Sequence, residues 1–501
     1  MEIEAMHLAH FTVQDIDHAG SLTLNGPKST IEIYSDDFFH LTEEQMRCVR
    51  GVSKDGVSIS AINCVGPGVP GTQTYHGRRK RFMSLVPNFV VLGPRHLEPQ
   101  QSNIASVSFS FTAANELFYD WGTFGQIIRK HRLSFGQLRE ILRAVSGAPK
   151  RRRRGGHLDL FYRWDRGPII EIETTMGTLK AWNATSERFP SPSGIELRNR
   201  VRVTCDFAVS RTLEGTVDAL YEIMPFFELV SQSRQNIENI ALTHVEAPER
   251  ELPLALHLVN LEHTSVENLE PTDALVSGGL QPEEFGRTLT GWINTMARRR
   301  TARYRFVQGF RRGHKYEIDR LVGAANAFDL LPSSDFDKSA SLPPEVEALL
   351  SGFEHEVKAR AKSSSQVNNY RDRILNLLGL NRGLNLRNKV FQRYATLSPV
   401  LKGKLAGMEE IIGCSVSARN FYVHGTPTKF SAVDLHALSI FFTDTLEFIF
   451  ATTELQLCGW SAERWAKESY SHSRLKWYIS NFPVNKQRVE SALSVAASGN
   501  V

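Results

Sequence analysis

The sequence predicts a multidomain α+β protein, with a mainly antiparallel β domain containing a few helices at the N-terminus and an all-α helical bundle at the C-terminus. Three observations support this prediction. Short strand-like runs dominate the first half, helical apolar spacing dominates the second half, and a segment with Pro and Gly separates them. A chain of 501 residues is long enough for two or three domains.

Residues 1–265 are expected to form the β-rich domain. The predicted strands before residue 112 are 21–24, 31–34, 57–65, 82–92 and 104–111, with a turn at Asn25-Gly26-Pro27. Strand patterns return at 158–164, 169–175, 194–207, 240–245 and 254–261, and residues 216–237 between them have helical spacing. Short strands at this spacing imply an antiparallel sheet.

Residues 266–284 are expected to connect the two parts, because they carry Pro271, Gly278, Gly279 and Pro282 with little periodicity. From 285 to 480 the apolar positions follow helical spacing, which predicts the bundle. Residues 481–501 are rich in Ser, Ala and Val, and we expect a partly ordered tail there.

Charge and cysteine content narrow the class of protein. The net charge of +5 favours an anionic partner. Five scattered cysteines without a Cys-x-x-Cys pair predict neither a disulfide framework nor a zinc site. The acidic start of the chain lacks a secretory signal, and we expect a cytoplasmic protein.

No cofactor and no metal are expected. His7 and His10 have helical spacing that would suit a metal, but no cluster of acids or cysteines accompanies them. The phosphate-binding pattern Gly-x4-Gly-Lys-Ser/Thr does not occur in the sequence, so the usual loop for nucleoside triphosphate hydrolysis is missing.

The most apolar stretch of the chain is 437–457, which has the length of a membrane span. Asp444, Glu447 and Glu454 interrupt it, and charged side chains are costly in lipid. We therefore expect a buried helix and no membrane.

A candidate active site lies at Arg419-Asn420-Phe421-Tyr422-Val423-His424. The residues before it follow helical spacing, and Gly425 after it is a stop signal for a helix. His424 is therefore expected in the last helical turn. Asn420 and His424 share one face, and the Arg419 side chain is long enough to reach the same space.

The same Arg-x4-His spacing also occurs at Arg152 and His157, so spacing by itself is weak support for a site. That copy contains two glycines, and glycine inside a helix costs about 1 kcal/mol relative to alanine. A loop is predicted there. The basic run at 150–154 receives no assigned role, because exposed charge runs are usually flexible loops.

The Arg419-to-His424 segment resembles the HEPN nuclease motif, and this resemblance implies cleavage of RNA. Without a metal, that reaction requires a base for the 2′-hydroxyl proton, an acid for the leaving 5′-oxygen and a cation for the phosphate. His424 would act as acid and base, and Arg419 would bind the phosphate. Asn420 would orient the imidazole or the phosphate. One motif supplies one His, so we expect a homodimer that pools two sites. In the alternative interpretation Arg419 pairs with Glu409 or Glu410, and His424 only ends a structural helix.

Residues 285–480 resemble the Apea-like HEPN domain through the helical bundle, the Ser417-to-Gly425 segment around the motif, and the apolar helix that ends in Leu-Gln-Leu-Cys-Gly. The N-terminal part resembles the ApeA N-terminal domain through 31–34, 84–93 and 107–111. The resemblance implies a bacterial anti-phage, abortive-infection ribonuclease. Its N-terminal part would sense a phage-derived trigger or restrain the nuclease, and its C-terminal part would cut RNA, with tRNA as one candidate substrate.

Arg299, Arg300 and Arg303 belong to the densest basic stretch of the C-terminal part and are candidate RNA-binding residues. A solvated helix face whose aromatic neighbours belong to the core explains the same pattern. Two other functions stay open: a noncatalytic HEPN module that dimerises or binds a nucleotide or partner, and a sheet domain whose ligand binding is the principal function.

Overall fold

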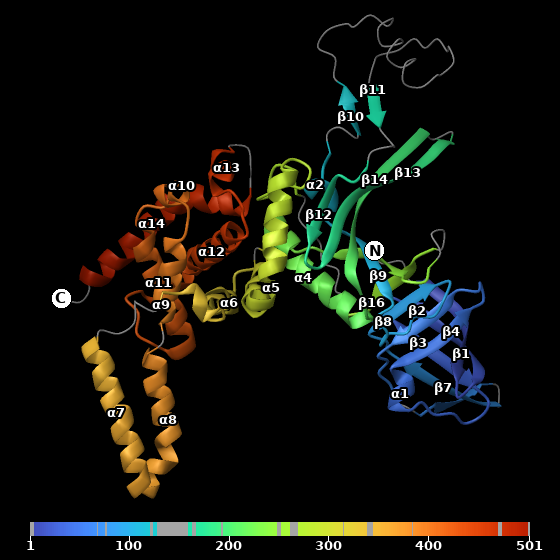
Figure 1. Ribbon diagram of the computed structural model, residues 1–501, viewed down its shortest axis with the longest axis horizontal. Coiled ribbons are helices and arrows are strands. Elements are labelled where there is room, and N and C mark those ends of the chain that lie inside the picture. The colour runs from blue at the N-terminus through green and yellow to red at the C-terminus, as the bar shows by residue number, and fades with distance from the viewer. Residues whose placement is uncertain are drawn as a thin grey trace, which may run out of the picture.

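The computed structural model describes residues 5–67, 69–75, 78–120, 124–127, 159–162, 167–191, 194–247, 252–260, 269–313, 315–337, 344–382, 384–468 and 473–498. The basic run at 150–154 and the Arg152 and His157 pair lie outside these residues. The predicted fold class is confirmed: an antiparallel sheet precedes a helical region (Figure 1).

Fourteen strands of the described chain form one antiparallel sheet, in the order β12-β13-β14-β9-β15-β16-β8-β5-β4-β1-β2-β3-β7-β6. The strands are β1 Ala5–Val13, β2 Ile16–Leu24, β3 Thr30–Ser35, β4 Cys48–Ser53, β5 Ser58–Ile62, β6 Gly71–Tyr75, β7 Arg78–Leu85, β8 Phe89–Gly93, β9 Ile104–Phe111, β12 Ile170–Thr174, β13 Gly177–Ser191, β14 Gly194–Arg211, β15 Ile237–His244 and β16 Leu254–Leu258. Two further strands, β10 Phe124–Ile127 and β11 Asp159–Tyr162, pair with each other. Two short helices, α1 Glu43–Met46 and α2 Ala114–Leu117, follow β3 and β9.

Strands β1–β8 enclose a core of their own, and in Figure 1 β1, β2, β3, β4 and β7 gather at one end of the molecule. Phe11 of β1 lies at its centre, fully buried. Its ring lies across Gly20 of β2 and Gly51 of β4, where an added Cβ would come within 2.7 Å and 2.6 Å of ring atoms. Glycine is required at both positions so that the neighbouring strands can approach this ring.

Several strand predictions need correction, and β4, β6 and β10 were not predicted. Residues 5–13 form β1, so His7 and His10 belong to a strand, where residues three apart point to opposite faces. The predicted strand 82–92 is two strands, β7 and β8, because Pro87 between them has no N–H for a sheet ladder. Strand β13 was not predicted at all, although it is one of the longest.

Helix α4, Leu213–Ser231, begins at Thr212, whose hydroxyl accepts from the Gly215 N–H. It covers the other part of the sheet, where Phe227 stacks on Phe111 of β9 at a ring distance of 4.5 Å. The same hydrophobic core continues into the helical region through Phe285 and Trp292. The two parts of the chain therefore share one core.

The described part of the expected connection, residues 269–284, contributes to that shared core. Leu275 and Val276 are fully buried, and the Leu275 carbonyl accepts hydrogen bonds from Trp460 Nε1 at 2.8 Å and Arg464 Nη2 at 2.9 Å. The Leu275 N–H donates to the carbonyl of Val230 at the end of α4. This segment fastens the sheet domain to the bundle.

The helices of the bundle are α5 Pro282–Phe310, α6 Ile318–Asp329, α7 Pro344–Ser363, α8 Ser365–Arg382, α9 Leu386–Ala395, α10 Pro399–Gly403, α11 Met408–His424, α12 Ala432–Leu457, α13 Ala462–Lys467 and α14 Arg474–Ser498. Helix α12 contacts α5, α6, α9, α11 and α14. The expected tail at 481–501 is wrong as far as Ser498, because α14 continues to that residue and buries Phe482 and Val489. Figure 1 shows α7 and α8 as a hairpin that projects from the bundle.

The acids that interrupt the apolar stretch all meet arginines in the interior. Within the described residues α12 is the one helix long and apolar enough to cross a membrane, and 78% of its most apolar window is buried. Arg474 binds Asp444 and Glu447, and Arg320 binds Glu447 at 2.8 Å. Burial would raise the pKa of Glu447, but these arginines hold it below its ordinary value. The apolar stretch is thus a core helix with paired charges.

One ion pair at the domain junction supports a stability prediction. Arg311 donates to both carboxylate oxygens of Glu228, at 2.8 Å and 2.9 Å, and the Glu228 side chain is 1% exposed. In Arg311→Met this carboxylate stays buried without its partner, so we expect the free energy of unfolding to fall by about 1–3 kcal/mol. Chemical denaturation measures the change. The neighbouring Arg312, which pairs with the exposed Glu317, is the control, and Arg312→Met should change it by less than about 0.5 kcal/mol. Equal effects would contradict the prediction.

Candidate active site at the end of α11

The motif lies at the C-terminal end of α11, where the sequence placed it. Gly425 follows the helix with φ +66°, and its N–H donates to the carbonyl of Phe421 at 2.9 Å. This left-handed conformation ends the helix directly after His424. His424 is exposed, while Arg419 and Asn420 are half-buried. The local sequence therefore presents an imidazole to solvent above a partly buried guanidinium.

The three predicted residues lie together. Arg419 Nη1 is 3.1 Å from His424 Nε2 and 3.0 Å from Asn420 Oδ1. The contact with His424 is a hydrogen bond when Nε2 is unprotonated and accepts from the guanidinium. Arg419 thus aligns the side chains of Asn420 and His424, which follow it on the helix.

Asn326 of α6 is a fourth member that the sequence did not reveal. Its Oδ1 accepts from Arg419 Nη2 at 2.8 Å. This part of the chain lies within 285–480, which was expected to be helical, and the structure has α6 there. In the sequence, Asn326 could have been noticed as a polar residue between two alanines, Ala325 and Ala327, which the structure shows to be buried.

Among the described residues Arg419 has no carboxylate within ion-pair distance, although its Nε is buried without a hydrogen-bond partner. The alternative in which Arg419 pairs with Glu409 or Glu410 is therefore wrong for this conformation. Glu410 instead lines a groove along α11. The Arg419 guanidinium contacts amide and imidazole groups and has no carboxylate partner among the described residues, so no acid compensates its positive charge.

The groove beside the motif has a volume of 490 Å³. Its lining residues are Arg387, Glu410, Gly413, Cys414, Ser417, Pro427, Thr428, Lys429, Phe430 and Leu493. Gly413 and Ser417 are spaced so that they share a helix face with Asn420 and His424. The groove therefore extends along α11 on the side that carries the imidazole.

The expected RNA contacts of Arg299 and Arg303 are wrong. Both side chains are buried, and they bind Glu454 of α12 at 2.5 Å and 3.0 Å. Arg300 is partly exposed, but it binds Asp218 of α4 at 3.0 Å across the domain junction. Residues four apart share one face of a helix, so Arg299 and Arg303 both turn into the bundle and do not reach the surface.

Among the described residues no group of three or more His, Cys, Asp or Glu side chains is placed to hold a metal ion. The groups that the site offers are one imidazole, one guanidinium and two amides. Such a site can move protons and bind an anion.

Asn326 is predicted to position Arg419. In Asn326→Ala the guanidinium loses a charge-assisted hydrogen bond, so we expect kcat for the RNA cleavage predicted from the sequence to fall about tenfold, with a smaller change in KM. Asn326→Asp retains an acceptor but neutralises Arg419, so its activity should fall further. If Asn326 had only a structural role, Asn326→Ala would lower the activity more than Asn326→Asp. Asn481→Ala is the control, because that amide contacts the Trp477 carbonyl of its own helix α14.

Fold and site together define a class of protein: an antiparallel sheet domain that shares its core with a helical bundle, with paired Arg and His at the end of one bundle helix. The family model described as ApeA N-terminal domain 1 matches residues 10–292. This match spans more than half of the chain, and the chain belongs to the ApeA family of anti-phage defence proteins. The matched region reaches into α5, in agreement with the core that the two parts share. No curated protein and no solved structure matches the chain.

Proposed function

We propose that this protein is a metal-independent HEPN endoribonuclease that cuts RNA during anti-phage defence. The observation that carries the proposal is the uncompensated Arg419 guanidinium 3.1 Å from the exposed His424 imidazole. A phosphodiester supplies the anion that this cation lacks, and its 2′-hydroxyl and 5′-oxygen need the proton transfers that an imidazole performs.

In the proposed reaction the 2′-oxygen attacks phosphorus while the bond from phosphorus to the 5′-oxygen breaks. The products are a 2′,3′-cyclic phosphate and a 5′-hydroxyl. One imidazole takes the 2′-hydroxyl proton, and one protonated imidazole gives a proton to the leaving 5′-oxygen. Arg419 stabilises the charge on the phosphate oxygens, and Asn420 and Asn326 hold its guanidinium in place.

Arg419 Nη1 lies 3.1 Å from His424 Nε2 in the free chain, and in the tautomer whose Nε2 accepts from the guanidinium this nitrogen is occupied before substrate binds. An incoming phosphate competes for the same guanidinium donors with the stronger, charged acceptor. Substrate binding would therefore release Nε2 for proton transfer. The resting contact keeps Arg419 and His424 side by side for the phosphate.

One chain offers one motif, and simultaneous acid and base catalysis requires two imidazoles. A homodimer that brings two α11 helix ends together across a two-fold axis would supply both. The groove on α11 would accept the RNA strand, with Arg387 and Lys429 near its phosphates. All five cysteines are free, which suits action in a reducing cytoplasm.

The test is cleavage of total RNA and of tRNA by the purified full-length protein in EDTA, followed by analysis of the new ends. We expect 2′,3′-cyclic phosphate and 5′-hydroxyl ends, and a dimer by light scattering at the assay concentration. If the RNA stays intact both without and with added lysate of phage-infected cells, a noncatalytic binding module is favoured. Activity that EDTA abolishes, or 5′-phosphate ends, would contradict the mechanism.

A further inference from the structure

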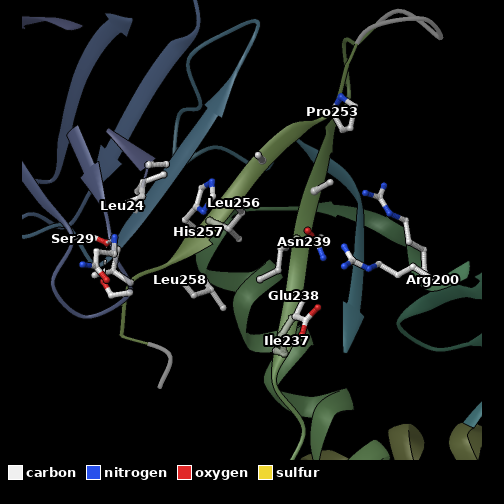
Figure 2. Close-up of a pocket in the computed structure, with 18 residues that line it drawn as sticks. Leu24, Ser29, Arg200, Ile237, Glu238, Asn239, Pro253, Leu256, His257 and Leu258 are labelled. Atoms are coloured by element: carbon white, nitrogen blue, oxygen red, sulfur yellow. Dashed lines mark hydrogen bonds between the residues drawn. The ribbon is translucent and has the colours of Figure 1, made fainter. Parts of the chain in front are cut away.

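A second site lies in the sheet domain, far along the chain from α11. A cavity of 730 Å³ lies on the face of β14, β15 and β16, with the β2–β3 turn at its border (Figure 2). Its lining includes Arg200 and Arg202 of β14, Glu238 and Asn239 of β15, and His257 of β16. Figure 2 shows Arg200 reaching from β14 toward Asn239, while His257 lies on the side of Leu24.

The alternation of β14 explains why this cavity is polar. Val201, Val203 and Cys205 are buried in the core that α4 covers. Arg200 and Arg202 occupy the intervening positions, so both guanidinium groups project from the opposite face of the sheet. Two adjacent cations on one strand face repel each other, and their placement in one cavity favours an anion between them.

Neither arginine is neutralised by the described part of the chain, where no hydrogen bond or ion pair engages Arg200 or Arg202. Arg198, two residues earlier on the same face, differs because it pairs with Glu196 and does not line the cavity. The cavity lining contains one carboxylate, Glu238. Of these three arginines, the two that line the cavity are thus the ones without a carboxylate partner in the described part of the chain.

The backbone of β15 is irregular at the same place. Asn239 has φ +52°, a left-handed conformation that is uncommon for a residue with a side chain. The pairing of β15 with β9 shifts register between Glu238 and Ala241, as in a β-bulge. Bulges re-aim side chains and are frequent beside binding sites. This bulge sets the Asn239 amide in the cavity lining opposite Arg200.

We infer that this cavity binds a small phosphorylated ligand of nucleotide size, with Arg200 and Arg202 on its phosphates. A planar guanidinium group can donate two parallel hydrogen bonds to two oxygens of one phosphate. The Asn239 amide and the His257 imidazole add further donors. The volume lies within the range of small-ligand pockets and exceeds what a single phosphate needs. The inference does not depend on the nuclease proposal, because it concerns a different face of the molecule.

The position of the site gives its ligand a direct mechanical connection to the bundle. Strand β14 ends at Arg211, and α4 begins two residues later at Leu213. Helix α4 then contacts α5 through the Asp218–Arg300 pair and through the bond from Trp292 Nε1 to the Glu222 carbonyl. A ligand that stiffens β14 therefore acts on the element that joins the two parts.

The test is isothermal titration of the full-length protein with ATP, AMP, inorganic pyrophosphate and adenosine. Pyrophosphate and ATP are expected to bind and adenosine is not, because the arginines recognise phosphate. In the double variant Arg200→Ala, Arg202→Ala the dissociation constants should rise at least about tenfold. Arg198→Ala is the matched control on the same strand and should leave binding unchanged.

Two comparisons decide the outcome. Tighter binding of ATP than pyrophosphate identifies a nucleotide as ligand, and equal binding identifies a polyphosphate group, so either result supports the site. Absence of pyrophosphate and ATP binding at millimolar concentration, or equal binding by the double variant, would overturn it. Because both arginines project from the outer face, the variant should keep the melting temperature of the unliganded protein, which differential scanning fluorimetry checks.

Discussion

His424→Ala is expected to lower the rate of RNA cleavage by about 10²–10⁴-fold, the contribution of a positioned acid or base. The imidazole is the group at the site that can move a proton near neutral pH, and Arg419 already holds it in place. The measurement is single-turnover cleavage of a labelled RNA. Because His424 is exposed at a helix end, the melting temperature should change little.

The control for this variant is His355→Ala, which removes an exposed histidine from α7, outside the site. It should cleave at the wild-type rate. Mixing wild-type and His424→Ala chains adds a test of the dimer, since a site that needs both imidazoles loses activity in the mixed dimer. Full activity of His424→Ala would end the nuclease proposal without affecting the ligand site in the sheet domain.

Glu454→Gln is expected to destabilise the bundle by about 3–5 kcal/mol, the cost of removing one partner from a buried charge cluster. Glu454 is fully buried and binds Arg299, Arg303 and Arg393. Asp335 also binds Arg299, so the cluster carries more positive than negative charge already. Burial lowers the pKa of Arg393, and Glu454 is the neighbour that most opposes this effect.

Urea denaturation monitored by tryptophan fluorescence measures this loss. Glutamine keeps the size of the side chain, so the change reports the charge and not a cavity. Glu463→Gln on the surface of α13 is the control and should remain within about 0.5 kcal/mol of the wild type. If the urea midpoint of Glu454→Gln equals that of the wild type, the buried arginines are neutralised in another way.

Local patterns in the sequence predicted the position and the clustering of the candidate site residues. Arg419, Asn420 and His424 belong to two turns of one helix, and their contacts follow from helical spacing. The end of α11 follows from Gly425, which adopts the left-handed conformation at low cost. Such features depend on neighbours in the chain and need no knowledge of the fold.

Features that depend on long-range packing were predicted poorly. Strand β1 was missed because its burial depends on pairing with β2 and β4. Strand β13 was missed although it pairs along almost its whole length with β14. The intrinsic preference for strand is weak, and the partner strands determine it.

By itself the sequence determined the α+β class, the helix that carries Arg419 and His424, and where that helix ends. Only the tertiary structure decided that Asn326 holds Arg419, that Arg299 and Arg303 neutralise a buried glutamate, and that Arg200 and Arg202 face a cavity. The physical reason is the range of the interactions. Backbone conformation and spacing act within a few residues, whereas the partner of a charge is set by the segment that packing brings beside it.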